Sequence, residues 1–205
     1  MIMSNSVQTN NQQSDKGMHP KVFMMLIGMI SMSMLFVALT SALIVKKSDT
    51  VLWKNFTLPL PFMISTLFII LSSITLQVSF NWFKKGDSRY KPLMGVTFVL
   101  SIIFCVFQVL GWNTLSNMGL KLSGNVSGSF VYVVTGFHLA HLFGGMTALL
   151  ITYIIHLIKT RNSLEEIKLL ININKRVNFQ VLLIFWHFLG GLWIYLFSFL
   201  YLIYS

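Results

Sequence analysis

The chain has 205 residues, of which 55% are hydrophobic and only 10% are charged, and its mean hydropathy is +0.75. A soluble globular domain is about a quarter charged, so this composition excludes an ordinary water-soluble globule and indicates a protein that faces lipid. The formal net charge of +10 does not indicate nucleic-acid binding, because the basic residues lie between apolar segments rather than along one stripe.

Residues 1–21 are polar and rich in Asn, Gln and Ser. We expect this stretch to be a disordered tail, because it has too few apolar residues to bury on folding. It shows neither the apolar core of a cleavable signal peptide nor the Arg-rich amphipathic pattern of an organellar presequence. This pattern favours the inner (plasma) membrane of a bacterium as the location.

Five apolar segments follow within residues 22–205, and each reaches the roughly 20 residues that a membrane-spanning helix needs. All Asp, Glu, Lys and Arg residues lie outside these segments. Lipid offers the backbone no hydrogen-bond partner, so each segment must be helical. The predicted fold class is an all-α membrane protein, a bundle of five transmembrane helices at about 22–45, 58–82, 93–115, 128–158 and 177–204.

The basic residues also predict the orientation of the bundle. Eleven Lys and Arg residues lie on the side of the N-terminal tail, and four lie on the other side. Lys and Arg accumulate in cytoplasmic loops, so we expect a cytoplasmic N-terminus and a periplasmic C-terminus. The largest predicted loop, 159–176, carries a short helix with Ser163 as its N-cap and Glu166 three residues on.

Histidines are the ionisable residues inside the predicted spans, which makes them functional candidates. His138 and His141 share one face of the fourth helix, His187 lies in the fifth, and His156 lies near the end of the fourth. We expect His138, His141 and His187 to form a structural polar cluster at mid-depth. Three roles stay open: hydrogen bonds that hold helices together, haem ligation, and a proton relay or quinone contact. The absence of carboxylates from the spans weighs against the relay.

Small residues recur at every fourth position of the fourth segment, and two adjacent glycines interrupt the fifth. Such residues let helices approach closely in a membrane. The predicted helix-packing seam consists of Gly136, Ala140, Gly144, Ala148, Gly190 and Gly191. The second segment also carries hydroxyl groups that can bond to their own helix or to a neighbour, at Ser65, Thr66, Ser72, Ser73 and Thr75.

Three groups of residues resemble the signature of subunit III of the haem–copper oxidases (cytochrome c oxidases), in its five-helix bacterial form. The matching positions are Thr135, Gly136, Phe137, His138 and His141 in the fourth segment, Trp186, His187, Phe188 and Trp193 in the fifth, and Gln108 with Trp112 in the third. The run from Leu58 to Thr75 also matches the family pattern. Together these matches cover nearly the whole chain after the tail.

The resemblance implies a non-catalytic subunit of a proton-pumping terminal oxidase in aerobic respiratory electron transport, which supports assembly, stability and lipid binding. It implies no catalytic site, metal or cofactor in this chain, a bound phospholipid, and haem and copper in subunits I and II. The implied partners are subunit I as the main contact, subunit II, small subunits and a larger respiratory supercomplex, but no nucleic acid.

The chain departs from the family pattern at its membrane carboxylates. The family usually has a glutamate in the helix that matches the first segment, and Met32 occupies that position here. Acidic residues common near Gln108 and after Trp186-His187-Phe188 are replaced at about Gly111 and Gly190. We therefore expect a role in packing, assembly and lipid binding rather than in carboxylate-mediated proton supply.

Two other classes of protein compete with this interpretation. A five-helix dihaem cytochrome b anchor of a respiratory dehydrogenase or reductase would need four membrane histidines paired across helices, whereas His138 and His141 share one turn. A transporter would need charged residues in a span, and the predicted spans contain none.

Overall fold

A computed structural model of the protein describes residues 20–49, 56–122, 126–159 and 173–204. These residues form helices α1 (Pro20–Asp49), α2 (Leu60–Lys85), α3 (Tyr90–Asn117), α4 (Val126–Lys159) and α6 (Ile173–Tyr204). Each of the five helices is long and apolar enough to cross a membrane. For the described residues, the predicted all-α fold with five helices long and apolar enough to span a membrane is therefore confirmed. The predicted loop helix at Ser163, and residues 1–19 of the predicted tail, lie outside the described residues.

The helix ends differ from the predicted ones for two physical reasons. Helix α2 begins at Leu60, later than predicted, because Pro59 has an extended ψ of 141° and serves as the N-cap. The other helices begin before and mostly end beyond their apolar segments, because hydropathy marks only the part that lies in hydrocarbon.

Helices α2 and α3 form an antiparallel hairpin with a tight turn. Gly86 ends α2 with a φ of 74°, and its N–H donates to Phe83 O at 3.1 Å while Asp87 N–H donates to Trp82 O at 3.1 Å. This left-handed cap suits glycine, which has no Cβ to clash. The hairpin fixes the register between α2 and α3.

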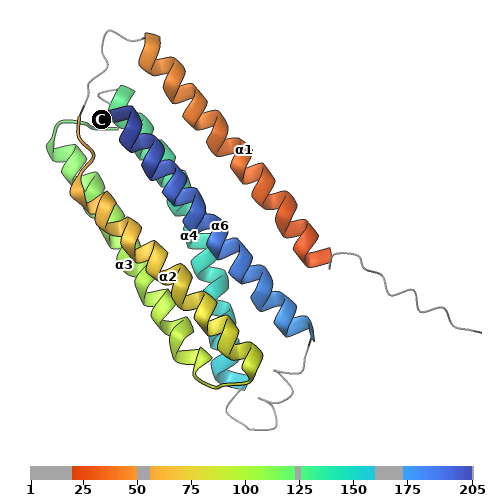
Figure 1. The fold of residues 1–205 in the computed structure, drawn as a ribbon. Coiled ribbons are helices and arrows are strands. Elements are labelled where there is room, and N and C mark those ends of the chain that lie inside the picture. Colours follow the sequence, from red (N-terminus) through yellow and green to blue (C-terminus); the bar gives the residue numbers. More distant parts are fainter. Residues whose placement is uncertain (1–19, 50–55, 123–125, 160–172, 205) are drawn as a thin grey trace, which may run out of the picture.

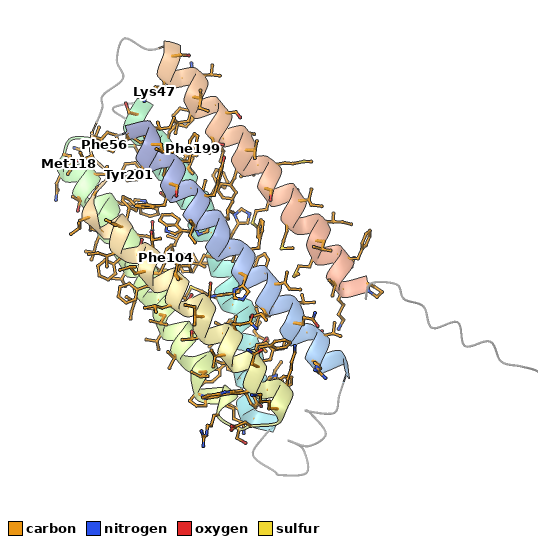
Figure 2. The ribbon with its side chains drawn as sticks, viewed as in Figure 1. Lys47, Phe56, Phe104, Met118, Phe199 and Tyr201 are labelled. Carbon is orange, nitrogen blue, oxygen red and sulfur yellow. The ribbon has the colours of Figure 1, made fainter. Side chains whose placement is uncertain are left out.

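Helix α6 occupies the centre of the arrangement, because it packs against α1, α2 and α4 (Figure 1). Helix α1 lies on the far side of α6 from the α2–α3 hairpin (Figure 1). At one end of the bundle Lys47 Nζ donates to Ile203 O at 2.5 Å, which ties the end of α1 to the end of α6 (Figure 2). The buried core runs along α6, and its largest fully buried side chains are mostly aromatic, among them Trp186, Trp193, Phe104 and Phe179.

Candidate functional site

Helix α2 carries a row of hydroxyl groups, Ser65, Thr66, Ser72 and Thr75, which we call the hydroxyl seam. Every one of them donates to a carbonyl of α2 itself, with oxygen–oxygen distances of 2.7 to 2.9 Å. A hydroxyl has one donor and two acceptor lone pairs, so a bond to its own helix leaves it free to accept from another helix. The seam therefore presents acceptors in a region where lipid provides no donor.

Two tryptophans of α6 use these acceptors. Trp193 Nε1 donates to Thr66 Oγ1 at 3.0 Å, and Trp186 Nε1 donates to Ser72 Oγ at 3.2 Å. Both indole rings are buried, with exposed fractions of 1% and 0%. Trp186 and Trp193 are seven residues apart, which places them on the same face of α6. The two bonds hold α6 against α2 at a fixed rotation.

Helix α3 binds the other side of the hydroxyl seam. Gln108 Nε2 donates to Ser65 Oγ at 2.9 Å, and the hydroxyl oxygens of Thr75 and Thr97 lie 2.9 Å apart. Helix α3 is joined to α4 in the same manner, because Trp112 Nε1 donates to Thr135 Oγ1 at 2.9 Å. The family-motif residues Gln108, Thr135, Trp186 and Trp193 thus all take part in interhelix hydrogen bonds.

His138 lies fully buried inside an aromatic enclosure. Its ring centroid lies 6.3 Å from that of Phe36, 6.2 Å from that of Phe104 and 5.2 Å from that of Trp193. These rings come from α1, α3 and α6, and Phe104 lies at mid-height of the bundle (Figure 2). Neither ring nitrogen of His138 hydrogen-bonds to the residues that the structure describes. His138 therefore packs as a core ring.

The other histidines have different surroundings. His141 Nδ1 lies 2.7 Å from Phe137 O of its own helix, and His187 Nε2 donates to Gln77 Oε1 of α2 at 3.0 Å. His156, near the end of α4, is buried with its Nδ1 3.2 Å from Tyr90 Oη. Within the described residues, no hydrogen bond joins the rings of His138, His141 and His187, and their role as one polar cluster stays a prediction.

The small residues of the predicted seam fall into two groups. A Cβ on Gly190 would lie 2.9 Å from Ser73 Oγ, so α6 and α2 approach closely there. Gly136, Gly144 and Gly191 have open space where a Cβ would point, and Ala140 and Ala148 are exposed. In α4 the glycine at a close contact is Gly145, whose Cβ would lie 2.9 Å from Leu189 Cδ1. Three residues of the stripe on α4, Ala140, Gly144 and Ala148, are therefore exposed, and the role of the stripe in packing another helix stays a prediction.

The three remaining predicted positions, Phe137, Phe188 and Met32, carry apolar side chains. Phe137 is exposed, Phe188 is half-buried, and Met32 is half-buried against Phe36 and its neighbours. Among the described residues, no group of three or more His, Cys, Asp or Glu side chains could hold a metal ion.

Sequence reasoning missed two relationships. It did not pair the tryptophans of α6 with the hydroxyls of α2, although the seven-residue spacing of Trp186 and Trp193 opposite a hydroxyl-rich helix was a usable signal. It also overlooked Gln77, an amide side chain inside the second predicted span. An amide in hydrocarbon requires a partner, and a search for one would have pointed to His187.

Comparison with known proteins covers almost the whole chain. A family model described as cytochrome c oxidase subunit III matches residues 11–205. A protein of Thermostichus vulcanus named cytochrome c oxidase subunit 3 is 31% identical over 192 residues, which covers 90% of this chain and 89% of that relative.

Two further relatives match over a shorter region. The cytochrome c oxidase subunit 3 of Corynebacterium diphtheriae is 28% identical over 142 residues, 69% of this chain. The probable cytochrome c oxidase subunit 3 of Mycobacterium bovis is 30% identical over 140 residues, 67% of this chain. The matched region spans 64% of the length of each of these two relatives.

Proposed function

The chain belongs to the cytochrome c oxidase subunit III family, and from this premise we propose that it is the non-catalytic subunit III of a proton-pumping terminal oxidase. It supports the assembly and stability of the complex beside subunit I, while subunits I and II hold the haem and copper. The family match over residues 11–205 favours this role over that of a dihaem cytochrome b anchor.

The observation that carries the proposal is how the family-motif side chains are used. The polar atoms of Trp186, Trp193 and Thr135 take part in hydrogen bonds between helices of this chain, and Gln108 donates to Ser65. In a membrane such bonds replace the hydrophobic drive that holds soluble helices together. Because the motif residues hold the helices of this chain together, they suit a structural role better than a catalytic one.

The proposed setting is a bacterial inner membrane with the N-terminus in the cytoplasm. The turn between α2 and α3 supports this orientation, because Lys84, Lys85, Arg89 and Lys91 gather at it. The outer face supports a lipid or protein environment, since exposed side chains such as Met34, Val99 and Ile151 are large and apolar.

Phospholipid binding is part of the proposed function. A groove of about 680 Å³ lies between α3 and α4 and is lined by Trp112, Tyr132, Gly136 and Lys121, among others. Its walls are mostly apolar side chains that suit an acyl chain, and the lysine ammonium suits a lipid phosphate. The groove therefore offers both parts of a phospholipid a matching surface.

Purification of the tagged chain from its own membrane tests the proposal. We expect the chain to copurify with haem-containing oxidase subunits that consume oxygen, and to show no haem Soret absorbance once it is separated from them. Stoichiometric haem on the separated chain, or copurification with a dehydrogenase instead of an oxidase, would refute the proposed function.

A further inference from the structure

A second groove, of about 400 Å³, runs along the outer surface between α2 and α6. Its lining includes Ser73 and Gln77 from α2, and His187, Gly190 and Gly191 from α6. All of its lining residues belong to these two helices, although α1 also packs on α6. We call it the α2–α6 groove.

A polar pair lies in this groove at a depth where lipid is apolar. Gln77 lies about 12 Å along α2 from Lys85, and His187 lies about 16 Å along α6 from Arg176, at 1.5 Å per residue. Both residues belong to helices that are apolar enough to span a membrane. An exposed polar group at this depth is costly unless a protein partner covers it.

The second ring nitrogen of His187, Nδ1, can accept a hydrogen bond. Its Nε2–H donates to Gln77 Oε1, because a carbonyl oxygen can only accept. That tautomer makes Nδ1 an acceptor, and Nδ1 hydrogen-bonds to none of the residues that the structure describes. The ring is exposed, so a donor from outside the bundle can reach it.

A gap for another backbone lies one turn away. Gly190 is occupied by the contact with Ser73, but a Cβ on Gly191 would meet no atom within 4 Å, and Gly191 is exposed. Exposed glycine on a membrane helix lets a neighbouring helix approach closely. The α2–α6 groove thus combines an acceptor on an exposed ring with room for a helix backbone.

We propose that the α2–α6 groove is the docking site for a transmembrane helix of another oxidase subunit, which donates a hydroxyl or amide hydrogen to His187 Nδ1 and packs on Gly191. This inference rests on the proposed function and specifies its contact surface. An acyl chain does not fit the same observations, because it has no donor for His187. Val99 on α3 and Ile151 on α4 are exposed outside this groove and serve as control positions.

Site-specific photo-crosslinking in membranes that hold the intact oxidase tests the docking site. A photoreactive residue replaces Ile74 or Ile194, which line the groove, or Val99 or Ile151, which are exposed on α3 and α4. We expect Ile74 and Ile194 to give an adduct with one and the same oxidase subunit, identified by mass spectrometry. Adducts only with lipid, with a quinone or with a second copy of this chain would overturn the proposal.

Substitution of the exposed glycine gives an independent test. Gly191→Leu fills the gap, because a Cβ there meets no atom of this chain within 4 Å, and Gly28→Leu on α1 is its matched control, since that site is also exposed and open. We expect Gly191→Leu to lower the oxidase recovered with the tagged chain by about tenfold and Gly28→Leu to leave it unchanged. Equal recovery for the two variants would overturn the proposal.

Different results would refute the proposed function and the docking site. If the wild-type chain copurifies with no oxidase subunit, the proposed function is wrong. If it copurifies while Ile74 and Ile194 give no subunit adduct, the proposed function stands and the docking site is wrong.

Discussion

Trp186 on α6 donates its indole N–H to Ser72 Oγ on α2 across 3.2 Å, and both side chains are fully buried. The bond joins residues 114 apart in sequence. Because Ser72 also donates to Ile69 O at 2.8 Å, its hydroxyl is used in both directions. This pair is the clearest example of how α2 holds the bundle together.

A double-mutant cycle measures that bond. We expect Trp186→Phe and Ser72→Ala to show a coupling of about 0.6 kcal/mol, the average found for hydrogen bonds between membrane helices. Unfolding of the purified chain in mixed detergent by added SDS supplies the free energies. Trp186→Phe combined with Ser65→Ala is the control, because Ser65 pairs with Gln108 instead, and this cycle should show no coupling. Equal coupling in both cycles would contradict the assignment.

A close contact between α3 and α2 predicts an intolerant glycine. A Cβ on Gly111 would lie 2.7 Å from Phe62 Cζ, and that ring is buried at 1% exposure. We expect Gly111→Ala to lower the free energy of unfolding by about 1–3 kcal/mol, because the ring must shift within a packed core.

Gly144→Ala is the matched control for this glycine, because its Cβ meets nothing within 4 Å. We expect this variant to be neutral or to stabilise the helix by up to about 1 kcal/mol. Thermal unfolding in detergent compares the two variants. Adding Phe62→Leu to Gly111→Ala should restore part of the loss, and no restoration would show that the clash is not the cause.

The sequence predicted the helices well and their contacts poorly. The length of each apolar segment and its lack of charged residues identify the span, because both properties can be read from the residues of that one helix. Which face of a helix meets its neighbour depends on the whole bundle. Thus the sequence indicated a helix-packing stripe at Gly136, Ala140 and Gly144, but it did not show that the glycine of α4 in close contact within this chain is Gly145, which meets Leu189.

The surroundings of the histidines were likewise not predictable from local sequence patterns. Spacing indicates that His138 and His141 share one face of α4, yet their environments differ, because Phe104 and Trp193 enclose only His138. The rotation of α6 sets the position of His187 in the α2–α6 groove, and a single sequence does not encode that rotation in any local pattern.

The two buried histidines of α4 should respond differently to removal. His138→Leu removes a ring that makes no hydrogen bond with the described residues, so we expect a change in unfolding free energy within about 1 kcal/mol. His156→Leu breaks the bond between Nδ1 and Tyr90 Oη inside the packed core, so we expect a loss of about 1–2 kcal/mol.

The same pair of variants also tests haem ligation by the buried histidine. If His138 held a haem, His138→Leu would abolish a Soret band of the purified chain. We expect both variants to copurify with oxidase subunits whose haem spectrum is unchanged. A spectrum that His138→Leu alters and His156→Leu does not would contradict the role of His138 as a core ring.

Labelling of single cysteines tests the proposed orientation. Cys105 is the only cysteine of the chain, so Cys105→Ser provides a background free of thiols. Arg89→Cys lies in the α2–α3 turn and Lys121→Cys follows the end of α3, so the two positions lie at opposite ends of that helix. With basic residues held in the cytoplasm, a membrane-impermeant maleimide should label Lys121→Cys in intact spheroplasts and Arg89→Cys only after permeabilisation. The opposite pattern would mean that the N-terminus is periplasmic, because α1 and α2 fix the side of the α2–α3 turn relative to the N-terminus.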